Sequence, residues 1–217
     1  MSRRTLVAVT VLVAVLGFTL VTVFYNYTAK QQAAIAVRTE LLVRPHAPVF
    51  GPRNAPVTIV EFFDPACGTC RAFHPVVKQI MRQYPNKVRV VMRYATFHQG
   101  SDQVVRILEA ARLQGKLEPV LEAVLEAQPR WSPHGGGAPN LGNAWQAASS
   151  AGMDVAKGRR EIMKPEITEI LSQDAADVSA LGVNKTPTFY VNGRPLPSFG
   201  IDQLFALVRE EVEAVGG

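Results

Sequence analysis

The sequence predicts an α/β domain that is interrupted by an all-helical insertion and preceded by one transmembrane helix. Two strands flank a helix over residues 57–95, apolar residues continue at helical spacing over 98–181, and strand character returns at 188–191 before a last amphipathic helix. Ahead of this pattern, residues 5–24 contain no charged side chain. With 217 residues, the chain is long enough to bury a sizeable core without disulfide staples.

The positive charge of the chain is concentrated around the uncharged segment. Arg3, Arg4 and Lys30 are the only charged residues within 1–30, and they supply +3 of the formal net charge of +5. Residues 31–217 hold 20 Lys and Arg against 18 Asp and Glu, with no basic run. We therefore expect no nucleic acid partner.

Residues 5–24 are expected to form a signal-anchor that crosses the bacterial inner membrane once. At about 1.5 Å per residue, a helix of this length spans roughly 30 Å, the thickness of the hydrocarbon core. Because Arg3 and Arg4 precede it, the N-terminus is expected in the cytoplasm and everything after Phe24 outside it, which in a bacterium is the periplasm. The alternative is a cleaved signal peptide, but the nearest small-x-small site, at 34–36, lies about ten residues beyond Phe24. Both alternatives export the domain.

Residues 25–56 are expected to be a tether between the segment 1–24 and the folded domain. An Ala-rich stretch at 31–43 can form a short helix, but the prolines that follow exclude a longer one. The folded domain is therefore predicted to begin near Val57. The prolines are Pro45, Pro48, Pro52 and Pro56.

The first half of the core, residues 57–97, is predicted to be a βαβ unit. Residues 57–63 and 88–95 are nearly continuous apolar runs, which is typical of strands buried on both faces. A segment with helical spacing lies between them. Strands joined by a crossover helix are expected to be parallel.

The helical insertion is predicted over residues 98–181. Within it, residues 128–143 are expected to be an irregular loop, because glycine and proline are frequent there. Asp154 is a candidate N-cap, and Gly182 marks the end of the last inserted helix. The second half of the core, 182–217, then reads as a β-hairpin turning at Asn192-Gly193 and a terminal amphipathic helix.

Cys67 and Cys70 lie between the first strand and the first helix, which places Cys67 at a helix N-terminus. Free backbone N–H groups and the helix dipole favour an anion there, so the pKa of the Cys67 thiol should fall and make it a nucleophile and a leaving group. Cys70, one turn later, would resolve the exchange. A structural disulfide would close a loop of only about four residues and stabilise little. A metal site would add His74 but lacks a second cysteine pair.

These residues carry a family resemblance. The segment VEFFDPACGTCRAF at 60–73, followed far downstream by Thr186-Pro187-Thr188, resembles the thioredoxin superfamily, and the inserted helices look like its DsbA branch. The resemblance covers about residues 57–215. It implies a thioredoxin fold and a periplasmic thiol–disulfide oxidoreductase whose redox-active disulfide is Cys67–Cys70, with no cofactor and no metal.

The resemblance also implies roles for single residues. Cys67 matches the surface nucleophile and Cys70 its buried partner, Pro187 matches the cis-proline beside the disulfide, and Thr186 matches the residue whose backbone pairs with the substrate chain. Gly68 and Thr69, between the cysteines, are expected to face the substrate as well.

Glu61 matches the family's buried acid in the central strand, which resembles a proton relay to the resolving cysteine. A carboxylate within the apolar run 57–63 needs an explanation of its own, because burying it costs several kcal/mol unless it is neutral or partnered. The alternative is an edge-strand glutamate that faces water. We expect the buried acid, because acids with shifted pKa values gather at sites of proton transfer.

The two residues between the cysteines bear on the direction of electron flow. Strongly oxidising DsbA proteins carry Pro-His between the cysteines, whereas Gly68-Thr69 offers only backbone N–H groups and a hydroxyl. We therefore expect a weaker DsbA-like oxidase, with an isomerase or a reductase as alternatives. The partners would be cysteine-containing exported polypeptides and either a DsbB-like membrane protein or a transmembrane electron donor. A copper-binding carrier that uses Cys67, Cys70 and His74 is the alternative from a different class.

Overall fold

The computed structural model describes residues 22, 24–26, 39–132 and 137–216. The chain divides into two compact units, Met1–Leu41 and Leu42–Gly217. Of the first unit, residues 22, 24–26 and 39–41 are described, and they are helical. The expected transmembrane segment 5–24 therefore lies, apart from residues 22 and 24, outside the described part. Within that part, no helix has the length and apolar character that a membrane crossing requires.

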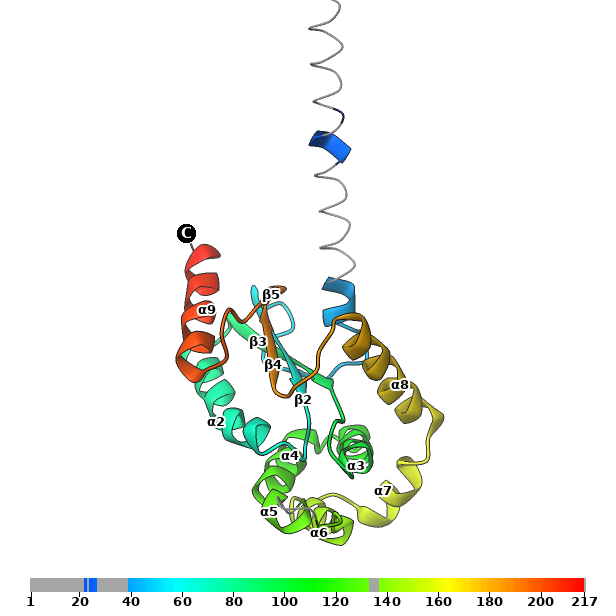
Figure 1. Cartoon of the computed structure of the whole chain (residues 1–217). Helices are drawn as coiled ribbons and strands as arrows, with labels where there is room; N and C mark the ends of the chain where they lie inside the picture. Colours follow the sequence, from blue (N-terminus) through cyan, green and yellow to red (C-terminus); the bar gives the residue numbers. More distant parts are fainter. Residues whose placement is uncertain (1–21, 23, 27–38, 133–136, 217) are drawn as a thin grey trace, which may run out of the picture. The chain divides into compact units, whose positions relative to one another are not determined.

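The second unit is built on a five-stranded sheet with the strand order β1-β3-β2-β4-β5 (Figure 1). The central pair β2 and β3 is parallel, as the βαβ pattern predicts, and the other three pairings are antiparallel. The hairpin of β4 and β5 turns at Asn192 and Gly193, which both have positive φ angles. The strands are β1 (Val49–Phe50), β2 (Val57–Phe63), β3 (Val88–Tyr94), β4 (Thr188–Val191) and β5 (Arg194–Pro195).

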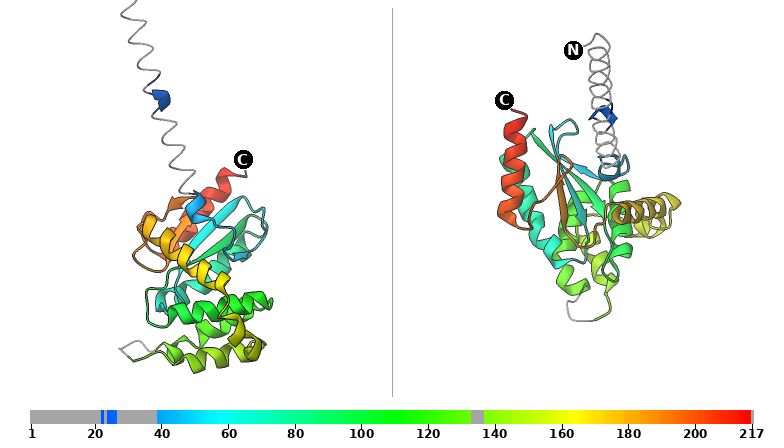
Figure 2. Two further views of the ribbon diagram at one scale, coloured as in Figure 1. Left: turned by 90° about the vertical axis from the view of Figure 1, so that its right-hand side faces the viewer. Right: turned by 45° about the horizontal axis from the view of Figure 1, so that its top comes forward.

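Helices cover both faces of the sheet (Figure 2). On one face, α2 (Gly68–Gln83) and α9 (Ile201–Ala214) pack on Ile59 and its neighbours. On the other, α8 (Pro165–Ala180) contributes Val178 to a cluster with Phe62. Because successive side chains of a strand point to opposite faces, Glu61 is directed to the same side as Ile59, toward α2.

The predicted helical insertion, residues 98–181, is present between β3 and β4 and ends with α8. Its helices bury a core of their own that reaches the start of α2. Asp154 caps α7 as predicted, since its side chain accepts a hydrogen bond from the Lys157 backbone N–H. The helices are α3 (Ser101–Leu113), α4 (Leu117–Glu126), α5 (Gln128–Trp131), α6 (Leu141–Ser150) and α7 (Val155–Glu161).

Two boundaries differ from the prediction. The expected loop 128–143 begins with the short helix α5 and ends inside α6, because Gln128 and Trp131 are fully buried and bond to backbone carbonyls.

The tether over 25–56 is also too long. Leu42 is 1% exposed, β1 pairs with β3, and Arg44 forms a bidentate ion pair with Asp177 of α8. The second unit therefore starts at Leu42 rather than Val57. The sequence did not predict this start, because β1 has only two residues, too few to show a periodic pattern, and is held by its pairing with β3.

Candidate active site

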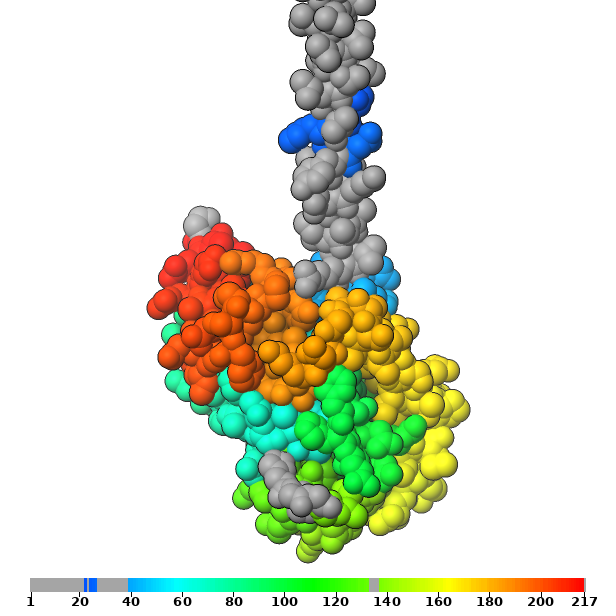
Figure 3. Space-filling model, viewed as in Figure 1, coloured from blue at the N-terminus to red at the C-terminus, as the bar shows by residue number. Residues whose placement is uncertain are grey.

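Cys67 and Cys70 lie at the junction between the end of β2 and the start of α2. Cys67 is the N-cap of α2, and its backbone N–H donates to the Asp64 carbonyl over 3.1 Å, which forms the tight turn between strand and helix. Both cysteines are free thiols in this structure. Cys67 is 6% exposed and Cys70 is 0% exposed, so the first can be reached from the surface and the second cannot. The segment around α2 reaches the surface between the C-terminal segment with β4, β5 and α9 and the helical insertion (Figure 3).

The Cys67 thiolate is strongly favoured. Its pKa is lowered to about 5, first by a hydrogen bond from the Cys70 thiol, then by the Thr186 side chain and the backbone amides of Cys70 and Thr69, while burial opposes the shift. As a thiol, Cys67 donates to the Thr186 carbonyl over 3.2 Å. Cys67 is therefore charged near pH 7, where a free thiol is largely protonated.

Cys70 has the opposite character. Burial, the hydrogen bond that it gives to Cys67, and the charges of Glu61 and Cys67 all raise the pKa of its thiol. Against these effects, the Asp64 backbone N–H donates to the Cys70 sulfur over 3.4 Å. The two thiols thus differ in the way that exchange requires, one ionised and one holding its proton.

Thr186 and Pro187 come to the cysteines from the far end of the chain. They precede β4, which pairs with β2 and so brings the start of β4 to the end of β2 that carries the active-site turn. The Thr186–Pro187 peptide bond is cis. The buried Thr186 hydroxyl has no hydrogen-bond partner among the described residues, and it is placed to donate to the thiolate of Cys67. Gly68 and Thr69 form the first turn of α2, with Thr69 exposed.

Glu61 is buried in the central strand, 2% exposed, between Met92 of β3 and Phe189 of β4. Its pKa is raised to about 8, mainly by burial and further by the negative charge of Cys67. Its Oε1 atom has no partner among the described residues. Glu61 therefore holds a proton near neutral pH and can release it as the pH rises or as the charge on Cys67 disappears.

The structure also shows functional residues that sequence reasoning missed. The buried Asp64 carboxylate accepts hydrogen bonds from the Ala66, Phe97 and His98 amides, the His98 ring and the Ser101 hydroxyl, which fastens the loop after β3 to the active-site turn. Its only sequence signal was the turn pair Asp64-Pro65.

Gln128 is the second missed residue. Its Nε2 donates to the Pro65 carbonyl over 2.7 Å and to the Cys67 carbonyl over 3.0 Å. Gln128 thereby ties the helical insertion to the active-site turn. In the sequence it lies within an expected loop, where nothing distinguishes it.

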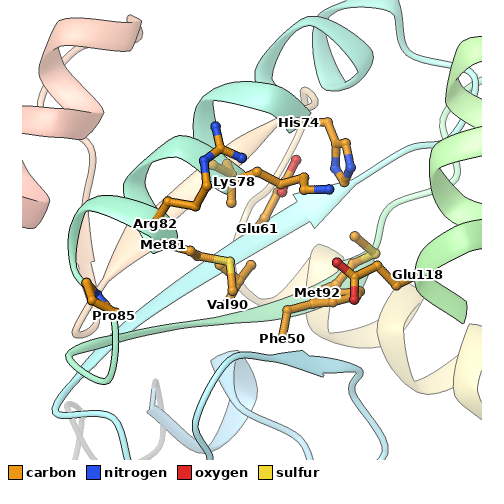
Figure 4. A pocket seen from close by; sticks show the side chains of 11 residues that line it. Phe50, Glu61, His74, Lys78, Met81, Arg82, Pro85, Val90, Met92 and Glu118 are labelled. Atoms are coloured by element: carbon orange, nitrogen blue, oxygen red, sulfur yellow. The ribbon is translucent and has the colours of Figure 1, made fainter.

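The metal-site alternative does not fit this arrangement. Cys67, Cys70 and His74 are all described, yet the described residues contain no group of three or more His, Cys, Asp or Glu side chains that could hold a metal ion. His74 instead lines a pocket together with Glu61 (Figure 4). The three residues that a copper carrier would use therefore do not form one cluster in the described part of the chain.

Comparison with known proteins gives the family. Residues 44–209 match the family model described as thioredoxin. The chain belongs to the thioredoxin family. The match includes β1 and the whole helical insertion, in agreement with a folded unit that starts at Leu42.

Solved structures of this family have the same fold. A thioredoxin-like oxidoreductase from Silicibacter pomeroyi DSS-3 is 33% identical, with a TM-score of 0.67, over 81% of this chain and 96% of that one. The thiol-disulfide exchange protein alpha-DsbA2 from Wolbachia pipientis is 20% identical, with a TM-score of 0.69, over 82% and 94%. The protein is thus a thioredoxin-family thiol–disulfide oxidoreductase with DsbA-like structural neighbours.

Curated relatives extend the comparison in a different direction. A Na(+)/H(+) antiporter NhaA 3 from Salinispora tropica is 31% identical over 151 residues, which are 67% of this chain and 22% of that protein. The chain spans about a quarter or less of the length of the curated relatives that it matches. Because the match covers so small a share of these proteins, their antiporter activity is not assigned to this chain.

Proposed function

We propose that this protein is a membrane-tethered oxidase that introduces disulfides into exported polypeptides through Cys67 and Cys70. The observation that carries the proposal is the contrast between the two thiols, because the pKa of Cys67 is lowered to about 5 while that of Cys70 is raised. A stabilised thiolate favours the reduced form of the enzyme, so its disulfide gives up its bond readily and oxidises other thiols.

The first step is attack on the disulfide at Cys67. A substrate thiolate attacks the Cys67 sulfur, the bond between Cys67 and substrate forms, and the Cys67–Cys70 bond breaks. Cys70 leaves with the electron pair of that bond and takes a proton from Glu61. A second substrate thiolate then attacks the substrate sulfur of the mixed disulfide, and Cys67 leaves as its stable thiolate. The substrate dithiol is oxidised and the enzyme is reduced.

Glu61 is coupled to this cycle by charge. While Cys67 is a thiolate, its charge raises the pKa of Glu61 and keeps the acid protonated. When Cys67 is bonded to a substrate, that charge is gone, so the pKa of Glu61 falls and a larger fraction of the acid is ionised and able to accept the Cys70 proton. The same acid can thus give and take the Cys70 proton in the two directions of exchange.

The substrate-facing residues are Gly68, Thr69, Thr186 and Pro187, which surround Cys67 from α2 and from the loop before β4. The backbone at Thr186, just before β4, can pair with an extended substrate chain, the mode in which β-strands recognise peptides through main-chain hydrogen bonds.

We place the active site in the periplasm and the anchor in the inner membrane through residues 5–24, on the charge pattern of Arg3 and Arg4. Recharging then requires a membrane oxidant of the DsbB type. In the isomerase or reductase alternatives, a transmembrane electron donor takes its place.

Trapping of mixed disulfides tests this function. Cys70→Ala in the full chain should accumulate disulfide-linked complexes with exported proteins, because the resolving thiol is gone, and Cys67→Ala should accumulate none. The complexes should disappear in reducing gels. Equal amounts of disulfide-linked complex in both variants, or no complex in either, would contradict the assignment of Cys67 as nucleophile.

A further inference from the structure

A pocket of about 550 Å³ opens onto Glu61 from a side that the active-site thiols do not line (Figure 4). Its apolar wall includes Phe50 and the methionines Met81 and Met92, and Glu61 and His74 also line it. The residues that line the pocket include neither cysteine, nor Thr186, nor Pro187. The buried acid therefore has its own opening, separate from the surface at which substrate reaches Cys67.

Two polar atoms at this pocket lack a hydrogen-bond partner in the described part of the chain. Glu61 Oε1 and His74 Nε2 are both buried, and neither has a hydrogen-bond partner among the described residues. Buried polar atoms are costly unless they are satisfied, by protein or by water. The pocket has room for several water molecules, each of which fills about 30 Å³ in the liquid. Water in the pocket can therefore join the two atoms.

The charged groups around His74 come from two helices. Lys78 and Arg82 of α2 and Glu118 of α4 line the pocket, and Lys78 forms an ion pair with Glu122 of α4. Burial and the charge of Lys78 lower the pKa of His74, while Glu122 opposes them. His74 is therefore a neutral imidazole near pH 7, which can accept a proton at one ring nitrogen and donate from the other.

We propose that this pocket is the route by which protons enter and leave the active site, from Glu61 through pocket water and His74 to the solvent. The proposal rests on the thiol exchange described above and adds the path for its proton. When the Cys70 sulfur attacks Cys67 in a mixed disulfide, its proton passes to the Glu61 carboxylate, the Cys67–Cys70 bond forms, and the partner thiolate leaves. Glu61 then returns the proton to the pocket, where His74 takes it on.

The separate opening matters because a bound polypeptide covers the other one. During exchange the substrate is covalently attached to Cys67 and lies against Thr186. A proton that had to leave past Cys67 would wait for the substrate to depart. The pocket lets Glu61 exchange its proton while the mixed disulfide is still in place.

The test follows the two cysteines separately with dithionitrobenzoate and the reduced full-length protein. The Cys67 thiolate attacks the reagent and releases one thionitrobenzoate in a first phase. Cys70 then displaces the second in a slower phase that requires loss of the Cys70 proton. We expect His74→Gln to slow the second phase about tenfold or more and to leave the first unchanged. Added imidazole, which is small enough for the pocket, should restore the second phase. His46→Gln, outside the pocket, is the matched control.

A second variant reports on His74 without removing it. Lys78→Met removes a positive charge beside His74, so the inflection that His74 gives to the pH profile of the second phase should move to higher pH. Lys164→Met, at the exposed start of α8, should not move it.

A second phase that His74→Gln leaves unchanged, or one that it slows and imidazole does not restore, would overturn the proposed route. An inflection that Lys78→Met leaves in place would do the same. A first phase that is slow at pH 6 in the unmodified protein would instead contradict the reactive Cys67 on which the proposed function rests.

Discussion

The Cys67 thiol lies 3.2 Å from the carbonyl oxygen of Thr186, a residue 119 positions away in the sequence. This contact joins the two halves of the core at the reactive sulfur. The β2–β4 pairing produces it, because the start of β4 lies beside the end of β2. Nucleophile and substrate-facing loop are thus held together by the sheet, and the properties of Cys67 depend on both.

The Thr186 hydroxyl is expected to stabilise the Cys67 thiolate. Thr186→Val removes the only side-chain donor that this loop offers to the sulfur, and a hydrogen bond to a charged group contributes about 1.5–3 kcal/mol. The pKa of Cys67 should therefore rise from about 5 by roughly one unit, measured by the ultraviolet absorbance of the thiolate against pH. Thr188→Val is the control, because that hydroxyl donates to the Lys185 carbonyl instead. An unchanged pKa in Thr186→Val would show that the hydroxyl does not reach the thiolate.

Glu61 is expected to make the reduced protein lose stability as the pH rises. Its pKa in the folded protein, about 8, lies above its ordinary value of 4.5. Stability is therefore complete below about pH 4.5 and is lost progressively up to about pH 8, where the buried group must ionise. Between pH 4 and pH 9, this effect should lower the unfolding free energy of the unmodified protein by about 3–5 kcal/mol. Glu61→Gln should not show this decrease, because the amide does not ionise.

Denaturant unfolding of the reduced full chain at both pH values measures this difference. The exposed Glu126→Gln serves as the control for the same substitution in a helix. Parallel pH profiles for Glu61→Gln and the unmodified protein would contradict the buried, protonated state of this acid.

Gln128 is expected to contribute to stability through the active-site turn. Gln128→Ala leaves the Pro65 carbonyl without its donor, which costs about 1–3 kcal/mol, whereas the Cys67 carbonyl keeps the hydrogen bond from the Arg71 backbone N–H. We expect a decrease in unfolding free energy of about 1–3 kcal/mol, measured by denaturant titration. Gln146→Ala, at an exposed position of α6, should change it by less than about 0.5 kcal/mol. A similar small effect in both variants would indicate that the two bonds to Gln128 are not needed.

The core of the fold could be predicted because its strands are buried on both faces. Residues 57–63 and 88–95 are mostly apolar, and they form β2 and β3 at almost the predicted bounds. β1 could not be predicted in the same way. Its two residues, Val49 and Phe50, lie among prolines and become a strand only because β3 offers them an edge.

Some residues of the site could likewise be predicted from the sequence, and others could not. The cysteine pair and Thr186-Pro187 are recognisable as motifs, and chemistry alone points to Cys67 at a helix N-terminus. Asp64 and Gln128 carry no such mark, since each acts through a contact with a segment more than 30 residues away. The pocket at Glu61 likewise exists only where α2 and α4 meet the sheet.

The reduction potential of the Cys67–Cys70 pair tests the central claim most directly. It is measured by equilibrating the full chain with defined ratios of reduced and oxidised glutathione. A low pKa at Cys67 without an imidazole between the cysteines predicts a value below that of DsbA, about −120 mV, and above about −250 mV. A value below about −250 mV, close to the −270 mV or so of thioredoxin, would contradict an oxidase and indicate a reductase.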